Sequence, residues 1–276
     1  RSSSRARPRR LRRARRPPSN DLTRGAARLV SERSESDVDR STRTPLEARR
    51  APSVFLVTDP RWSLARTEDV IERAGHALGP GALGVQLRDK TASLVDLART
   101  ARALRAVTAR VGALLLVNAP GTPALRVAVE TGADGVHVPC APEHIAEART
   151  QLGAASWIST PAHTDDAVAL AKDAGATSVL VSPIFETPGK GPPRGVDALT
   201  AARSLSLSLS PSPSPSRELV VLALGGVEAS RVAACAAAGA HGVAVIRALL
   251  DADDPAAMAR ALDAPFRGRI ERPTRG

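Results

Sequence analysis

Short runs of apolar and largely β-branched residues recur along the chain from residue 54 onward. Most of these runs lack an alternation of apolar and polar positions, which is typical of strands buried on both faces of a parallel sheet. There are eight of them, VFLVT (54–58), LGVQL (83–87), ALLLVN (113–118), DGVHV (134–138), SWIS (156–159), SVLVS (178–182), LVVLAL (219–224) and GVAVI (242–246). The pattern therefore predicts eight parallel strands.

The segments between these runs have the spacing of amphipathic helices. Examples are SLVDLARTARALRAVTAR (93–110), APEHIAEARTQL (141–152) and DDAVALAKDAGA (165–176). Eight strand–helix units in roughly 200 residues predict an α/β protein with a (β/α)₈ TIM barrel, here spanning residues 51–265. A doubly wound sheet would need G-x-G-x-x-G after an early strand, and TDPRWS (58–63) does not match it.

Three segments fall outside the strand–helix pattern. Residues 204–216, SLSLSLSPSPSPS, form a two-residue repeat, which we interpret as a flexible insertion that forms neither helix nor core. Residues 266–276 are expected to be a tail. Residues 1–50 hold 16 Arg and 6 acidic residues, which is +10 of the chain's net charge of +11, and they predict a disordered basic extension.

The basic extension has several interpretations, of which an extension without a selected function is favoured. A nucleic-acid-binding tail and an organellar transit peptide are the alternatives, so we expect nucleic-acid binding only as a non-specific property of residues 1–50.

The rest of the chain is nearly neutral, with 23 Lys and Arg against 22 Asp and Glu. Cys140 and Cys235 are too few for a disulfide framework and indicate a reducing compartment, which predicts a cytoplasmic protein. The sequence contains no run of 18 apolar residues, so no membrane span is predicted.

Candidate chemistry lies directly after the predicted strands, because the active sites of TIM barrels form at the carboxyl ends of their strands. Gln86, Arg88 and Lys90 are two residues apart, so they share one face of the chain and point toward one site. Hydrogen-bond donors of this kind suit a polyanion such as a diphosphate. The alternative is that Arg88 and Lys90 form a solvated edge.

A second group of candidates follows the sixth, seventh and eighth strands. Gly225 and Gly226 come after the seventh strand and Ile246 ends the eighth, where barrels commonly bind phosphate through backbone N–H groups. In the loop SPIFETPGKG, Thr187 offers a hydroxyl and Lys190 an ammonium group. The sequence thus predicts two anion sites at one barrel mouth.

Seven segments, in order and each at its strand, resemble the thiamine-phosphate synthase and thiazole tautomerase superfamily. They are VQLRDK (85–90), Asn118, GADGVHV (132–138), AHT (162–164), SPIFETPGKG (182–191), ALGGV (223–227) and GAHGVAVI (239–246). The resemblance implies a TIM barrel that binds small phosphorylated thiamine precursors. The expected activity joins hydroxymethylpyrimidine diphosphate to a thiazole phosphate and releases diphosphate, with Mg²⁺ present.

The resemblance also implies roles for individual residues. It places Gln86, Arg88, Lys90, Asn118 and Lys190 around the pyrimidine diphosphate. It places Thr187, Gly225, Gly226 and Ile246 around the thiazole phosphate. Arg88 and Lys190 would act in catalysis by stabilising the charge of the leaving diphosphate.

Two positions depart from the family pattern, and both concern the metal. Synthases usually bind Mg²⁺ through two Asp residues, which are Ala119 and Pro142 in this chain. Mg²⁺ requires oxygen ligands, so the protein's metal ligands are unknown and Mg²⁺ is expected only as a complex with the substrate diphosphate.

His163 stands where tautomerases keep a catalytic histidine. A thiazole tautomerase and a non-catalytic barrel that binds a precursor are therefore the alternatives to a synthase.

Overall fold

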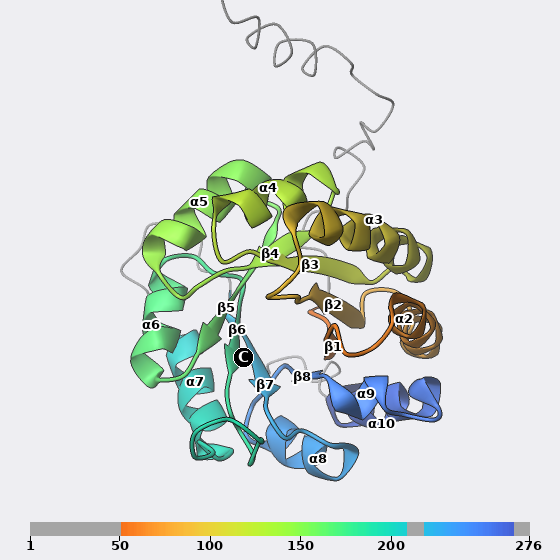
Figure 1. Cartoon of the computed structure of the whole chain (residues 1–276). Helices are drawn as coiled ribbons and strands as arrows, with labels where there is room; N and C mark the ends of the chain where they lie inside the picture. The colour runs from red at the N-terminus through yellow and green to blue at the C-terminus, as the bar shows by residue number, and fades with distance from the viewer. Residues whose placement is uncertain (1–50, 209–217, 268–276) are drawn as a thin grey trace, which may run out of the picture. The chain divides into compact units, whose positions relative to one another are not determined.

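The structure is a computed structural model that describes residues 51–208 and 218–267. The predicted extension at residues 1–50, most of the Ser/Pro segment and residues 268–276 lie outside this range. In the described residues, eight parallel strands close into a barrel in chain order, each paired with the next and β1 with β8. Figure 1 looks into this barrel and shows the strands as an inner ring surrounded by helices.

The eight strands lie where the apolar runs predicted them, which confirms the (β/α)₈ fold. They are β1 (Val54–Val57), β2 (Leu83–Leu87), β3 (Leu114–Asn118), β4 (Gly135–His137), β5 (Trp157–Ala162), β6 (Ser178–Val181), β7 (Val220–Leu224) and β8 (Gly242–Val245). The helices are α2 (Leu64–Leu78), α3 (Leu94–Val111), α4 (Thr122–Glu130), α5 (Pro142–Leu152), α6 (Asp165–Asp173), α7 (Asp197–Leu207), α8 (Ala229–Ala237), α9 (Arg247–Leu250) and α10 (Pro255–Arg267).

The prediction for the Ser/Pro segment was wrong at its beginning. Residues 204–207 form the last turn of α7, and Ser206 is buried there. The Ser206 hydroxyl donates to the carbonyl of Arg203 at 2.7 Å, which satisfies its polar atom inside the helix. Lys172 of α6 donates to the carbonyl of Leu205 at 2.9 Å and so caps the helix end. The Ser-Leu repeat therefore begins as helix, and residues 209–217 lie outside the described residues.

The predicted end of the barrel at residue 265 is also two residues too early. Helix α10 continues to Arg267, because Phe266 is 3% exposed and packs in the hydrophobic core between sheet and helices. Asp263, which is buried one turn earlier, accepts hydrogen bonds from Arg267 and from Ser53 ahead of β1. These contacts fasten the last helix to the first strand.

The lower barrel interior is filled by large apolar side chains. The Phe55 and Trp157 rings lie 5.9 Å apart, and the Trp157 indole N–H donates to the Ser178 hydroxyl at 2.8 Å. Gly84 makes room for this packing, since a Cβ there would lie 2.2 Å from the Phe55 ring. This packing fills the interior beneath the mouth at the carboxyl ends of the strands, which is where barrels of this kind bind their ligands.

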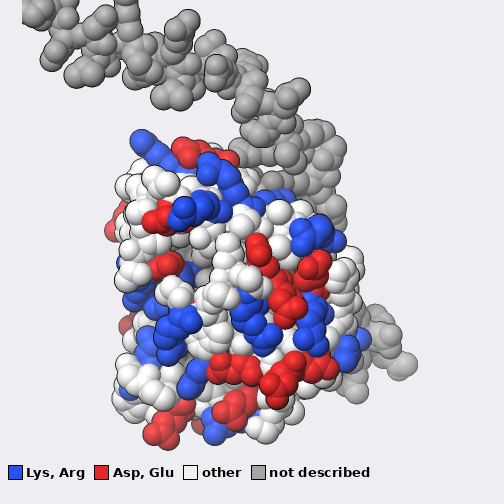
Figure 2. All heavy atoms as spheres, turned by 45° about the vertical axis from the view of Figure 1, so that its right-hand side comes forward, with Lys and Arg blue, Asp and Glu red and all other residues white. Residues whose placement is uncertain are grey.

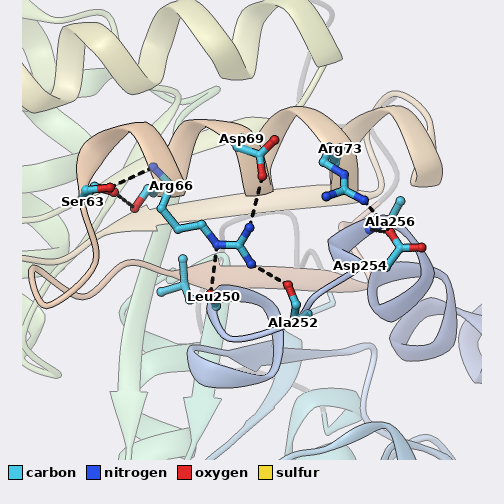
Figure 3. A network of polar contacts seen from close by, with 9 residues as sticks. Ser63, Arg66, Asp69, Arg73, Leu250, Ala252, Asp254 and Ala256 are labelled. Atoms are coloured by element: carbon cyan, nitrogen blue, oxygen red, sulfur yellow. Dashed lines mark hydrogen bonds and ion pairs between the residues drawn. The ribbon is translucent and has the colours of Figure 1, made fainter.

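The first and last units are joined by Arg66 on α2, as Figure 3 shows. Its guanidinium donates to the carbonyls of Leu250 at 3.1 Å and Ala252 at 2.5 Å, and it pairs with Asp69 at 3.2 Å. These carbonyls belong to the end of α9 and the turn that follows it, where backbone acceptors lack helical partners. Arg66 therefore helps to close the ring of helices.

We expect Arg66→Ala to lower the free energy of unfolding by about 2 kcal/mol, because it leaves two carbonyls without their charged donor. Arg73→Ala is the matched control on the same helix. Arg73 makes a single 2.9 Å ion pair with Asp254 between exposed side chains, a type of contact that contributes about 0–1 kcal/mol. Urea denaturation of both variants measures the difference. Equal losses would contradict a closing role for Arg66.

The surface of the barrel carries both charges in mixture. Figure 2 shows Lys and Arg interspersed with Asp and Glu on the side that includes α2 and α10. This distribution agrees with the near-neutral balance of residues 51–276. In the described part of the chain, every helix is too short or too polar to cross a membrane.

Candidate active site

A cavity of about 630 Å³ opens at the carboxyl ends of the strands. All ten residues that the sequence predicted for the site line it, namely Gln86, Arg88, Lys90, Asn118, His163, Thr187, Lys190, Gly225, Gly226 and Ile246. They come from loops or strand ends of β2, β3 and β5–β8, so the closed barrel brings together residues up to 160 positions apart. Which substrate each residue touches stays a prediction.

One end of the cavity carries the polar residues of β2 and β3. Gln86 is 3% exposed and faces inward, while Arg88 is half-buried and Lys90 exposed. The backbone N–H of Arg88 donates to the Thr58 hydroxyl at 2.9 Å, which fixes the start of this loop against β1. Among the described residues, no ion pair or hydrogen bond occupies the Arg88 guanidinium. This charge is therefore available to an anion in the cavity.

The other end is built from two loops that pair through their backbones. The N–H groups of Ile184 and Phe185, after β6, donate to the carbonyls of Leu224 at 2.9 Å and Gly225 at 3.0 Å. Gly226 has φ +61°, and a Cβ there would lie 2.5 Å from the carbonyl oxygen of Glu186. The loops thus approach so closely that only glycine fits at this position.

Thr187 and Lys190 lie in the same loop, and one of them differs from expectation. The Thr187 hydroxyl donates to the carbonyl of Phe185 at 2.9 Å, so its proton is used within the loop rather than offered to a ligand. The backbone of Lys190 donates to the carbonyl of Thr187 at 3.1 Å and forms a tight turn. The Lys190 side chain is exposed at the cavity, and nothing in the described residues pairs with its ammonium group. Lys190 is therefore an exposed cation that can contact an anion in the cavity.

His163 stands at the rim of the cavity after β5. Its Nδ1 lies 3.0 Å from the carbonyl oxygen of Ser182. Because a carbonyl can only accept, this contact places the proton of neutral His163 on Nδ1 and leaves Nε2 as the basic atom. The Nε2 atom of His163 can therefore accept a proton from a ligand in the cavity and return it.

His137, the last residue of β4, also lines the cavity. Its Nδ1 lies 3.0 Å from the Ser159 hydroxyl. Burial, together with the positive charges of Arg88 and His163, lowers the pKa of His137 to about 4. His137 is consequently neutral at pH 7 and presents a hydrogen-bonding wall rather than a charge.

This shift predicts a pH dependence of stability. The unfolded chain takes up a proton at His137 near its usual pKa of 6.5, whereas the folded chain does so only near 4. Between these values the unfolded state binds more protons, so we expect the free energy of unfolding to fall as the pH drops from 6.5 to 4. His137→Asn should flatten this part of the profile, and His76→Asn, on an exposed helix position, should not. Identical profiles for wild type and His137→Asn would overturn the assignment.

Besides His137, four further polar or charged residues of the cavity were not among the predicted ones, namely Ser182, Glu228, Arg247 and Asp251. Ser182 directly follows β6, and Arg247 comes two residues after the end of β8, so their positions were an available signal. Glu228 and Asp251 lie farther along their loops, so only the folded barrel reveals them.

The two positions that hold metal-binding Asp residues in the family do not fit a metal in this chain. Ala119 is 2% exposed and packs in the hydrophobic core rather than on the cavity, while Pro142 is the first residue of α5. Neither side chain has an oxygen atom. Over the described residues, no three His, Cys, Asp or Glu side chains gather as a metal site requires.

Two carboxylates that follow β1 and β2, Asp59 and Asp89, already have hydrogen-bond partners. Both oxygens of Asp59 accept from Arg61 at 2.9–3.0 Å, and these hydrogen bonds keep the pKa of Asp59 below its usual value. Asp89 accepts from the backbone N–H of Thr91 at 2.8 Å, which likewise lowers its pKa. Among the described residues, neither Ala119 nor Pro142 offers an oxygen ligand, and Asp59 and Asp89 are engaged in their own loops.

Comparison with known proteins gives a consistent result. A family model described as thiamine monophosphate synthase matches residues 54–249. The thiamine-phosphate synthase of Thioalkalivibrio sulfidiphilus is 40% identical over 204 residues, covering 72% of this chain and 89% of that protein. The thiamine-phosphate synthase of Methanoculleus marisnigri is 36% identical over 212 residues, covering 76% and 92%. The solved thiamine phosphate pyrophosphorylase of Pyrococcus furiosus has a TM-score of 0.63 at 22% identity, over 80% of this chain and 98% of that one, and supports the fold.

Proposed function

Because the chain belongs to the thiamine monophosphate synthase family, we propose that it is a transferase that condenses hydroxymethylpyrimidine diphosphate with thiazole phosphate. The observation that carries this proposal is the single cavity with cations at one end and a paired glycine loop at the other. Two anionic substrates fit such a cavity with their rings between the two ends. The reaction would take place in the cytoplasm, in keeping with two free cysteines.

The chemistry requires charge stabilisation more than acid or base groups. Condensation forms a bond from the thiazole nitrogen to the pyrimidine methylene carbon and breaks the bond from that carbon to the diphosphate oxygen. Negative charge grows on the diphosphate as it leaves. Fixed cations that meet this charge stabilise the transition state more than the ground state. Arg88, Lys90 and Lys190 are the residues assigned to this task.

The phosphate of the second substrate would be held by backbone groups. Gly225 and Gly226 allow close approach, and α8 begins three residues later with its partial positive charge. Gln86 and Asn118, which project from neighbouring strands, would orient the pyrimidine. With no carboxylate at Ala119 and Pro142, these residues and any Mg²⁺ that arrives with the diphosphate would share its charge.

A thiazole tautomerase is the second candidate, and His163 is the observation that favours it. Its Nε2 is available at the cavity, as proton transfer on a thiazole carboxylate phosphate would require. The two candidates share the phosphate end of the cavity and differ in whether a diphosphate is used.

One assay distinguishes these possibilities. The purified protein is incubated with the pyrimidine diphosphate and thiazole phosphate, with and without Mg²⁺, and separately with the thiazole carboxylate phosphate. Thiamine phosphate formation supports the synthase. Isomerisation that is lost in His163→Ala, without any thiamine phosphate, supports the tautomerase instead. Binding without either reaction identifies a non-catalytic barrel and contradicts the proposed activity.

A further inference from the structure

Arg231, on the first turns of α8, touches both loops of the phosphate end. Its Nη1 donates to the carbonyl oxygen of Gly226 at 3.0 Å. Its guanidinium also lies over the ring of Phe185, 5.1 Å from the centroid, which is a cation–π contact. Gly226 belongs to the turn after β7 and Phe185 to the loop after β6, so one side chain bridges the two.

The hydrogen bond to Gly226 fixes the direction of a neighbouring donor. In a trans peptide group, the C=O of one residue and the N–H of the next point in opposite directions. Holding the Gly226 carbonyl toward Arg231 therefore turns the N–H of Val227 the other way. Val227 lines the main cavity, whereas Arg231 does not. Within the described residues, no hydrogen bond uses the Val227 N–H, so it is free to meet an anion.

Two arginine side chains, Arg231 and Arg194, contact the outer side of the loop after β6. A second cavity of about 370 Å³ lies there between Arg231 and Arg194, so that side lacks close packing. Arg194 anchors the far end of the loop through its ion pair with Asp165 at 2.6 Å. On the side that faces β7, the loop is held by the backbone hydrogen bonds of Ile184 and Phe185 to Leu224 and Gly225, and by the contact of Phe185 with Arg231. The backbone N–H groups of Arg194 and Gly195 hold Pro183 and Ile184 at the base of the loop, so Arg231 adds the contact that fixes the loop at Phe185.

We infer that Arg231 is a positioning residue for the phosphate site. It acts through Gly226 and Phe185 by aiming the Val227 N–H into the cavity and by holding Phe185, at the start of the loop after β6, against the turn after β7. The ligand it serves is a phosphate monoester dianion, and this inference rests on the proposed function. The pyrimidine end of the cavity at β2 and β3 does not touch this bridge, and the turn that carries Lys190 is closed by its own hydrogen bond to the Thr187 carbonyl.

The test compares Arg231→Ala with Arg231→Lys, and with Ser230→Ala as a control on an exposed neighbouring helix position. Arg231→Ala removes both contacts, whereas Lys keeps a donor and a positive charge. We expect Arg231→Ala to raise the KM for thiazole phosphate about tenfold, the scale of a small displacement of a binding group. The KM for the pyrimidine diphosphate and the kcat at saturation should stay within about twofold. Lys should restore most of the affinity, and Ser230→Ala should match wild type.

Calorimetric titration with thiazole phosphate and with inorganic phosphate separates this inference from the proposed activity, since neither titration needs turnover. A wild type that binds phosphate but makes no thiamine phosphate refutes the activity, while a loss of binding in Arg231→Ala still supports the positioning role. Equal binding by wild type and Arg231→Ala overturns the role, and so does a wild type that binds neither ligand. Equal losses for both substrates would reduce Arg231 to a general structural residue and also overturn it.

Discussion

Lys190→Ala should lower kcat/KM for thiamine phosphate formation by between about tenfold and a thousandfold, the range for losing one preorganised group that stabilises transition-state charge. Lys190 lies at the mouth, and its ammonium group has no partner among the described residues, so it contributes its charge to a ligand rather than to the fold. Because Ala119 and Pro142 offer no carboxylate to hold a metal, we expect the diphosphate to rely more on the cationic side chains. We therefore expect kcat to fall rather than only KM to rise.

Two controls make this expectation specific. Lys190→Arg keeps the positive charge and should retain much of the rate. Arg102→Ala removes a positive charge from an exposed position of α3 that does not line the cavity, and it should leave the rate unchanged. The measurement is steady-state kinetics with both substrates varied. A Lys190→Ala enzyme with the rate of wild type would remove Lys190 from the catalytic machinery.

The fold could be predicted from sequence because each barrel unit repeats one simple rule. A run such as Val54–Val57 is buried on both faces, and an amphipathic helix follows it, so local pattern and global topology agree. The candidate site followed from the same rule. Since the carboxyl ends of parallel strands meet at one edge, Gln86 and Gly226 had to face one mouth although 140 residues separate them.

What escaped prediction depends on contacts between distant segments. The neutral state of His137 results from burial and from the charges of Arg88 and His163, which no local pattern contains. The helical turn at residues 204–207 depends on Lys172, which caps it from another helix. The bridge made by Arg231 requires two loops to meet, and the sequence shows only an arginine on a helix. Tertiary context determined each of these features.

Gly226→Ala should weaken phosphate binding by about a hundredfold or more, even though it adds a single methyl group. The new Cβ would lie 2.5 Å from the carbonyl oxygen of Glu186 and 2.9 Å from the Cβ of Phe185, so the two loops would have to separate. The left-handed backbone at φ +61° adds about 1–2 kcal/mol of strain for any residue with a Cβ. Relieving the steric clash and the backbone strain would displace the turn after β7, which is expected to hold the phosphate.

Gly191→Ala is the matched control for this change, because the same methyl group there meets no atom within 4 Å and the backbone is not left-handed. It should bind phosphate like wild type. Both variants should keep the closed barrel, since the strands and the apolar interior do not involve either glycine, and far-UV circular dichroism checks this. Calorimetric titration with thiazole phosphate then decides the matter. Unchanged affinity in a folded Gly226→Ala protein would show that the phosphate binds somewhere other than the turn after β7.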